Sequence, residues 1–221
     1  MSYNPDFFKP ESFEHAQSLI LTPEGGTTAG RWEKETQWAL NMLTTFSPVD
    51  ENSRVLDWGC GVGRLSQALI QAHSCSVVGV DLQPEMLELA NDYVNHKNFL
   101  SVALPDAPGL LKSGTFTHVM CVWVLQHSPY IEQEIPLLWH LLQPGGTIFV
   151  VENITKAIPN QTSFYDDGVP TTTVLEKTGF ETQAQGLIPS HVTTPRVHKN
   201  SWWRLLTKPN KRILNEHDIH H

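Results

Sequence analysis

The chain has 221 residues, enough for one sizeable α/β domain with its own core. Hydrophobic residues make up 40 % and charged residues 17 %, which is typical of a globular protein rather than a disordered chain. The formal net charge of −8 disfavours nucleic acid as the main partner, and the lack of any run of 18 apolar residues predicts no membrane-spanning helix.

The cysteines and the first residues indicate a cytoplasmic protein. Cys60, Cys75 and Cys121 form no C-x-x-C pair and are odd in number, so we expect free thiols in a reducing compartment. The first six residues lack the basic and apolar regions of a signal peptide. The sequence leaves the oligomeric state open.

Hydrophobic periodicity divides the chain into alternating strands and helices. Residues 1–30 have weak periodicity and are expected to form an irregular cap, followed by an amphipathic helix over residues 31–46. Pro136 indicates that the helix near 130–142 starts later than its pattern suggests. Strands are expected near 54–58, 76–81, 98–103, 117–124, 146–152, 180–187 and 201–207, with further helices near 63–72, 84–94 and 171–178. No helix is expected between the last two strands.

This alternation predicts a parallel sheet covered by helices on both faces. In such sheets ligands bind beyond the carboxyl ends of the strands. No internal repeat or low-complexity linker is present, so we expect one domain.

A glycine-rich turn follows the first strand. Residues 55–64 read Val-Leu-Asp-Trp-Gly-Cys-Gly-Val-Gly-Arg, an apolar strand with Asp57, three alternating glycines and the start of a helix. Glycines allow backbone to turn tightly and to approach a ligand closely. The dinucleotide fingerprint G-x-G-x-x-G requires a small third residue, but that position holds Arg64. This departure argues against an oxidoreductase that uses NAD(P).

The pattern D-x-G-x-G-x-G-R instead resembles motif I of the class I S-adenosylmethionine (SAM)-dependent methyltransferases. In that family the glycine loop wraps the methionine part and the ribose of the cofactor. Asp81 ends the next strand, 22 residues after Gly59, near the ~20 expected for an acid that holds ribose hydroxyls. Alternatively, Asp81 only caps the helix that starts near Pro84.

The resemblance covers roughly residues 50–187. It includes the Pro-Gly-Gly passage within residues 142–150 and the segment 122–127 after the fourth strand. It implies a Rossmann-like α/β fold, with a mostly parallel seven-stranded sheet, helices on both faces and a C-terminal antiparallel hairpin. The expected organisation is a cap and helix over 1–46 within the same domain, a methyltransferase domain over 47–210, and a tail over 211–221.

The resemblance also implies a set of cofactor contacts. Arg64 is expected to pair with the methionine carboxylate; the alternative is an exposed arginine in the first helical turn. Asp106 lies in the loop that usually contacts adenine, where an ordinary turn residue is equally compatible. The expected SAM-binding residues are Asp57, Gly59, Cys60, Gly61, Arg64, Asp81, Leu82, Asp106, Ala107 and Val122.

His127 is the candidate general base, because histidine has an unperturbed pKa near neutrality. The alternative is a structural histidine. Glu152 and Asn153 end the fifth strand and are expected to face the pocket. Asp166 and Asp167 either lie over its mouth or form a solvated turn. No native metal site is expected.

Trp123-x-x-x-His127, an acid–Asn pair and paired aspartates are together similar to the protein α-N-terminal amine methyltransferases. That similarity implies a substrate site at Trp123 with catalytic roles for His127, Asn153 and Asp166 or Asp167, although the aspartates lie further from Asn153 here. We therefore expect SN2 transfer of a methyl group to an oxygen or nitrogen of a small molecule, with a peptide amine as the alternative. A non-catalytic SAM-binding or partner-binding module is a third possibility, disfavoured by the available proton acceptors.

Overall fold

A computed structural model describes residues 2–210 and shows an α/β fold built on a seven-stranded sheet. The strand order is β3-β2-β1-β4-β5-β9-β8; β9 pairs antiparallel with β5 and β8, and the remaining pairs are parallel. This confirms the predicted fold class. The strands of this sheet are Arg54–Trp58 (β1), Ser76–Asp81 (β2), Phe99–Ala103 (β3), Phe116–Val122 (β4), Leu142–Asn153 (β5), Glu181–Gly186 (β8) and Ser201–Thr207 (β9).

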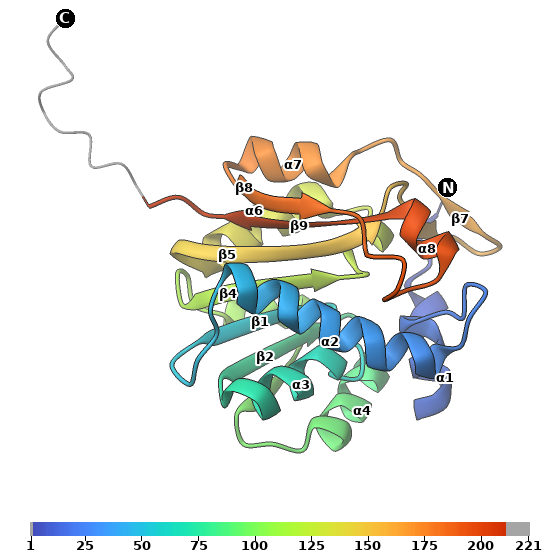
Figure 1. Cartoon of the computed structure of the whole chain (residues 1–221), viewed down its shortest axis with the longest axis horizontal. Coiled ribbons are helices and arrows are strands. Elements are labelled where there is room, and N and C mark those ends of the chain that lie inside the picture. The colour runs from blue at the N-terminus through green and yellow to red at the C-terminus, as the bar shows by residue number, and fades with distance from the viewer. Residues whose placement is uncertain (1, 211–221) are drawn as a thin grey trace, which may run out of the picture.

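Helices cover both faces of the sheet, with α2, α3 and α4 on the face toward the viewer in Figure 1. Helices α6 and α7 contact one another on the opposite face. The helices are Phe13–Ile20 (α1), Thr28–Phe46 (α2), Arg64–His73 (α3), Pro84–Val94 (α4), Ala107–Leu110 (α5), Ile131–Leu141 (α6), Thr171–Thr178 (α7) and Pro195–Asn200 (α8). Short 3₁₀ turns occur at Pro5–Phe8 (η1), Leu104–Asp106 (η2) and Leu125–His127 (η3).

Alternation along the central strands gives each face its own core. Leu56 and Val119 point into the core beneath α6 and α7, whereas Val55 and Met120 belong to the core beneath α2 and α3. Successive side chains of a strand point to opposite faces, which is why adjacent apolar residues serve different layers. All three cysteines are buried and free, as expected.

The N-terminal region is more regular than predicted. It contains η1 and α1, and α2 begins at Thr28, before the expected start at Arg31. Ser12 and Thr27 cap the two helices, each accepting a hydrogen bond from a backbone N–H of the first turn. These caps fix helix starts in a region whose apolar periodicity is weak.

Other elements also differ from the sequence expectations. Strand β4 ends at Val122 because Trp123 adopts a left-handed backbone conformation, with φ of 62°. Helix α6 begins at Ile131 and includes Pro136, so a later start was wrong. The fold tolerates this proline at the loss of one intrahelical bond, since its nitrogen carries no hydrogen. Finally, α8 lies between the last two strands, whereas no helix was expected there.

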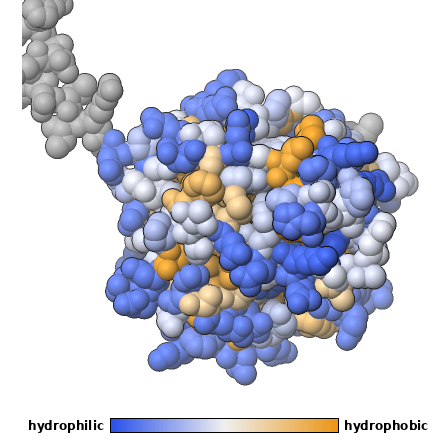
Figure 2. Space-filling view, in the orientation of Figure 1, coloured by the Kyte–Doolittle hydropathy of each residue, from blue (hydrophilic) through white to orange (hydrophobic). Residues whose placement is uncertain are grey.

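The N-terminal elements, α8 and a separate two-stranded hairpin gather at one end of the sheet (Figure 1). The hairpin pairs Ile158–Pro159 (β6) with Phe164–Tyr165 (β7). This end holds the carboxyl ends of the parallel strands. Figure 2 shows mainly hydrophilic side chains on the face toward the viewer, with hydrophobic ones in small separate groups. Within residues 2–210, every helix is too short or too polar to cross a membrane.

Candidate active site

The glycine loop turns sharply between β1 and α3. Gly59, Gly61 and Gly63 all have positive φ, at 73°, 53° and 77°. The N–H groups of Gly59 and Cys60 donate to the Val80 carbonyl, so the loop is bonded to the end of β2. These backbone conformations explain the alternating glycines, because other residues adopt them only with strain.

Space also restricts this loop to glycine. A Cβ on Gly59 would lie 2.3 Å from Val124 Cγ2, and one on Gly61 would lie 2.6 Å from Ile20 Cδ1. Both distances are shorter than ordinary contacts, so either side chain would have to displace a neighbour. The loop is therefore a cradle of bare backbone.

Two acids stabilise the loop and the helix that follows it. Asp81 accepts hydrogen bonds from the backbone N–H groups of Gly61 (2.8 Å) and Gln83 (3.0 Å). Asp57 is buried and accepts from the Ser66 hydroxyl at 2.6 Å. Burial raises the pKa of Asp57 to about 6 and also raises that of Asp81. The helix that begins at Pro84 has Gln83, not Asp81, as its N-cap residue.

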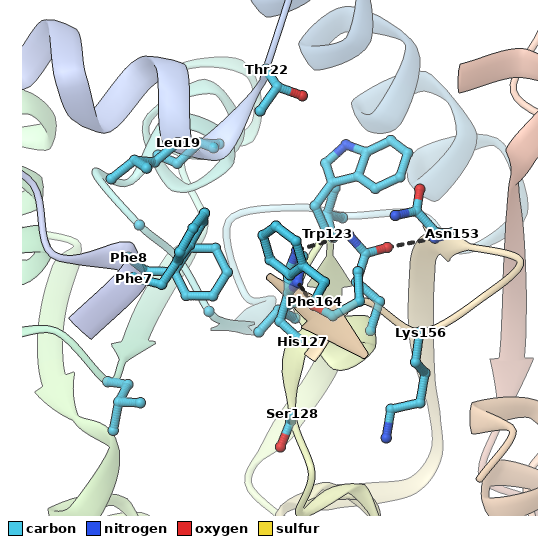
Figure 3. Close-up of a pocket in the computed structure, with 18 of the residues that line it drawn as sticks. Phe7, Phe8, Leu19, Thr22, Trp123, His127, Ser128, Asn153, Lys156 and Phe164 are labelled. Carbon is cyan, nitrogen blue, oxygen red and sulfur yellow. Dashed lines mark hydrogen bonds between the residues drawn. The ribbon is translucent and has the colours of Figure 1, made fainter. Parts of the chain in front are cut away.

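A cavity of about 1060 Å³ opens beside this loop, at the upper limit of the ~300–1,000 Å³ typical of ligand sites. Its wall includes backbone of the glycine loop, the ends of β2, β4 and β5, and the N-terminal segment. Aromatic side chains and a few polar groups line it together, as Figure 3 shows for Phe7, Phe8, Phe164, His127 and Asn153.

The N-terminal segment and the β6–β7 hairpin meet over one part of the cavity. The Phe7 and Phe164 rings pack edge-on with centroids 4.7 Å apart, and Phe8 lies 4.8 Å from the His127 ring. Backbone contacts hold the segment in place, because the N–H of Asn4 donates to the Pro159 carbonyl at 3.0 Å. These segments are far apart in the sequence, so only the fold brings their aromatic rings together.

Trp123 lies at the strained end of β4 and lines the cavity. The backbone N–H of Trp123 donates to the Val151 carbonyl at 2.8 Å, and the Arg31 guanidinium lies 5.7 Å from the centroid of the Trp123 ring. Arg31 is buried and bonds Glu35 through two nitrogens, at 2.6 and 3.0 Å. A left-handed tryptophan is unusual and is typical of functional sites, where surrounding contacts maintain the strain.

His127 belongs to a closed hydrogen-bond network. Its Nδ1 lies 2.6 Å from the Ala157 carbonyl oxygen, and its Nε2 lies 2.9 Å from the amide nitrogen of Gln126. The side-chain oxygen of Gln126 accepts from the backbone N–H of Asn153 at 2.5 Å (Figure 3). The backbone N–H of Ala157 donates to the backbone carbonyl of Gln126. Burial lowers the pKa of His127 to about 4, so the imidazole is neutral at pH 7.

The structure brings half of the predicted site residues to the cavity wall. Those that line it are Gly59, Gly61, Asp81, Leu82, Val122, Trp123, His127 and Asn153. Those outside the wall are Asp57, Cys60, Arg64, Asp106, Ala107, Glu152, Asp166 and Asp167.

Arg64 and Glu152 point away from the cavity. Arg64 is buried rather than exposed; it donates to the Thr36 hydroxyl and lies over the Trp32 ring. Its Nε has no hydrogen-bond partner among the described residues. Glu152 accepts from Thr171 at the start of α7, and burial raises the pKa of Glu152 to about 8.

The predicted aspartates form local contacts instead. Asp106 is exposed in η2. Asp166 accepts from the N–H of Gly168, as in a turn, whereas Asp167 pairs with Lys156 at 2.7 Å. Lys156 is buried and lines the cavity, so Asp167 lies one residue away from the wall.

Several residues at or beside the cavity wall were not predicted from the sequence. Arg31, which lines the wall, and Glu35 beside it are spaced i,i+4 on the amphipathic helix α2, which is the pattern of a helical ion pair. Gln126 precedes the candidate histidine, but nothing in a single sequence shows that its amide faces the imidazole. Phe7, Phe8 and Phe164 lie in segments with weak periodicity.

Comparison with known proteins identifies the central region. Residues 56–150 match a family described as a methyltransferase domain. A sterol 24-C-methyltransferase of Debaryomyces hansenii is 29% identical over 131 residues, covering 58% of this chain and 33% of that protein. A ubiquinone biosynthesis O-methyltransferase of Coxiella burnetii is 31% identical over 101 residues, covering 45% of this chain and 43% of that protein. The chain thus spans less than half the length of these relatives.

Solved structures share the fold. Phosphoethanolamine N-methyltransferase 2 of Haemonchus contortus, in complex with SAM, has a TM-score of 0.67 at 15% identity, covering 93% of this chain and 60% of that one. The [4+2]-cyclase SpnF has a TM-score of 0.67 at 13% identity, covering 79% and 81%. At such identities the likeness establishes the fold alone. Residues 56–150 thus match a methyltransferase domain, and the sheet that contains them has the fold of these solved structures.

Proposed function

We propose that the protein transfers a methyl group from SAM to an oxygen or nitrogen of a small molecule bound in the 1060 Å³ cavity. The observation that carries the proposal is the meeting of a bare glycine cradle and the Asp81 carboxylate at the wall of one large cavity. The methyltransferase family of residues 56–150 supports the same activity.

The residues beside the loop fit a nucleoside cofactor. Gly59 and Gly61 line the cavity, and Asp81 keeps acceptor lone pairs for hydroxyl groups after binding two N–H groups. Leu82 and Leu104 offer apolar surface to an adenine ring. When bound, SAM supplies an electrophilic methyl group on sulfur, which a nucleophile displaces directly.

Arg31 is our candidate for the carboxylate of the cofactor, in place of Arg64. Arg31 lines the cavity, and its contacts with Glu35 and the Thr22 carbonyl use three of its five N–H groups. The planar guanidinium suits a carboxylate, and Glu35 holds it in a fixed orientation.

The acceptor part of the cavity favours a molecule with an apolar body. Phe7, Phe8, Phe164 and Ile154 line it, and Phe7, Phe164 and Ile154 are also 42%, 44% and 60% exposed. Exposed apolar side chains around a cavity mark a surface that binds a ligand. The names of the two relatives, a sterol and a ubiquinone-biosynthesis methyltransferase, agree with this class of acceptor.

His127 lies beside Phe8 and Phe164 in this part of the cavity, and Asn153 also lines the cavity. The general-base role of His127 stays a prediction: neutral imidazole is able to accept a proton, but a pKa of about 4 makes it a weak base. Asp167 is engaged by Lys156, so an aspartate contribution to the reaction requires that pair to open. A peptide α-amine remains the alternative acceptor.

Two measurements test the proposal. Calorimetric titration of SAM and of S-adenosylhomocysteine into the purified protein should give micromolar binding of both. Incubation with SAM and a panel of sterols, quinols, phenols, small amines and peptides with free N-termini should then release S-adenosylhomocysteine with the apolar small molecules. If neither SAM nor S-adenosylhomocysteine binds, the methyltransferase proposal is refuted. If only peptides are methylated, a peptide amine replaces the small molecule as the proposed acceptor.

A further inference from the structure

We infer that Gln126 is a positioning residue that fixes His127 as the neutral tautomer with its hydrogen on Nδ1 and covers the lone pair of Nε2. The tautomer follows from the network alone. The consequence for catalysis rests on the proposed function.

Two independent contacts determine the tautomer. The Ala157 carbonyl, 2.6 Å from Nδ1, only accepts hydrogen bonds, so Nδ1 must carry the hydrogen. On the other side of the ring, the Gln126 oxygen is committed to the N–H of Asn153, which only donates. The amide nitrogen of Gln126 therefore faces Nε2, and since an amide NH₂ only donates, Nε2 must accept.

The network joins three segments that are distant in sequence. Gln126 lies in η3 after β4, Asn153 ends β5, and Ala157 precedes β6. Gln126 is 4% exposed, and its backbone carbonyl accepts from the N–H of Ala157 at 2.8 Å. Each polar group in this loop has a partner of the opposite kind, which makes a single arrangement stable in a buried site.

His127 is also held as an aromatic surface. Phe8 lies 4.8 Å and Phe164 lies 6.1 Å from the centroid of its ring. A substrate in the cavity consequently meets the imidazole as part of the wall, and Nε2 becomes available to it only when the Gln126 amide moves or exchanges partners. Gln126 thus controls whether His127 accepts a proton.

Burial and the Ala157 carbonyl set the pKa of His127, and no charged neighbour contributes resolvably. The other titratable side chains on the cavity wall come from several elements, and among them Lys156 is paired with Asp167. They are Tyr3, Glu24, Arg31, Asp81, Tyr130, Glu134, Lys156 and Arg196. A new charge at position 126 would therefore be the first to act on the imidazole directly.

The test compares Gln126→Glu with Gln71→Glu, the same change on the exposed surface of α3. The introduced carboxylate retains an acceptor for the N–H of Asn153 and offers a second acceptor to Nε2. We expect it to favour the imidazolium and to raise the pKa of His127 by roughly 1–3 units, the usual effect of a close opposite charge. Gln71→Glu should leave that pKa unchanged.

Ring ¹⁵N chemical shifts of His127, measured over pH 4–8 without cofactor, give both tautomer and pKa. The wild-type protein should show the Nδ1–H tautomer throughout the neutral range. An Nε2–H tautomer, a mixture of tautomers, or an unchanged pKa in folded Gln126→Glu would overturn the inference. The wild-type spectrum decides the tautomer even if the variant does not fold.

Catalysis provides the second readout. Gln126→Glu should shift the acidic limb of the kcat/KM–pH profile together with the measured pKa of His127, whereas Gln71→Glu should not. A spectroscopic shift with an unmoved profile would remove the catalytic consequence. Absence of SAM binding by the wild-type protein would refute the proposed function and leave the tautomer result standing.

Discussion

Replacement of Gly61 by alanine tests whether the glycine loop is the cofactor cradle. The residue has φ of 53°, and an alanine Cβ would lie 2.6 Å from Ile20 Cδ1. The left-handed conformation costs alanine roughly 1–2 kcal/mol of stability. The Ile20 methyl group must also move, and because Ile20 lines the cavity, that movement changes the space beside the loop.

Gly114→Ala is the matched control. Gly114 has a similar φ of 62°, but nothing lies within 4 Å of its added Cβ. It precedes β4, so it lies at the end of that parallel strand opposite to the cavity. The two variants should therefore lose similar conformational stability, whereas only Gly61→Ala should disturb the site.

Urea unfolding and calorimetric titration with SAM separate the two effects. We expect a loss of about 1–2 kcal/mol in the free energy of unfolding for both variants. Gly61→Ala should weaken SAM binding at least tenfold, equivalent to about 1.4 kcal/mol. Wild-type affinity in folded Gly61→Ala, or an equal loss of affinity in Gly114→Ala, would refute our placement of the cofactor.

Three further changes test other parts of the structure. Burial raises the pKa of Glu152 from 4.5 to about 8 in the folded protein. Between these pH values the carboxyl group ionises in the unfolded chain but not in the folded protein. Rising pH therefore lowers the free energy of unfolding by about 1.4 kcal/mol per pH unit, or roughly 3 kcal/mol by pH 7. Glu152→Gln should show a stability advantage in urea that grows from pH 4 to 8, and a pH-independent difference would contradict burial as the cause. Arg31→Lys should weaken SAM binding more than Arg64→Lys does by calorimetry; the reverse order would restore Arg64 as the carboxylate partner. Phe164→Ala should raise KM for an apolar acceptor several-fold while SAM affinity stays within twofold, and an effect on SAM alone would place Phe164 outside the acceptor part.

The central fold followed from local patterns. The alternation of strands and helices between residues 54 and 103, and the glycine turn that joins the first strand to its helix, were predicted at the positions where the structure has them. Periodicity and turn chemistry depend on neighbouring residues, so one sequence contains them. The same reasoning brought Asp81 next to the loop, where it accepts from Gly61.

Local patterns failed where distant segments decide the structure. Strand β4 ends before Trp123 because Trp123 has a strained backbone conformation. The hydrogen bond from the backbone N–H of Trp123 to the Val151 carbonyl maintains this conformation. The polar caps of α1 and α2, rather than an apolar stripe, define the N-terminal helices.

The sequence by itself determined the class of fold and the location of the glycine loop, whereas tertiary packing decided which side chains face the cavity. Glu152 and Asn153 are adjacent on β5, yet only Asn153 lines the cavity, since successive strand residues point to opposite faces. Arg31 reaches the cavity and Arg64 does not, because α2 crosses in front of the sheet and buries Arg64 against Thr36 (Figure 1). Such directions depend on contacts between segments that the chain brings together only when it folds.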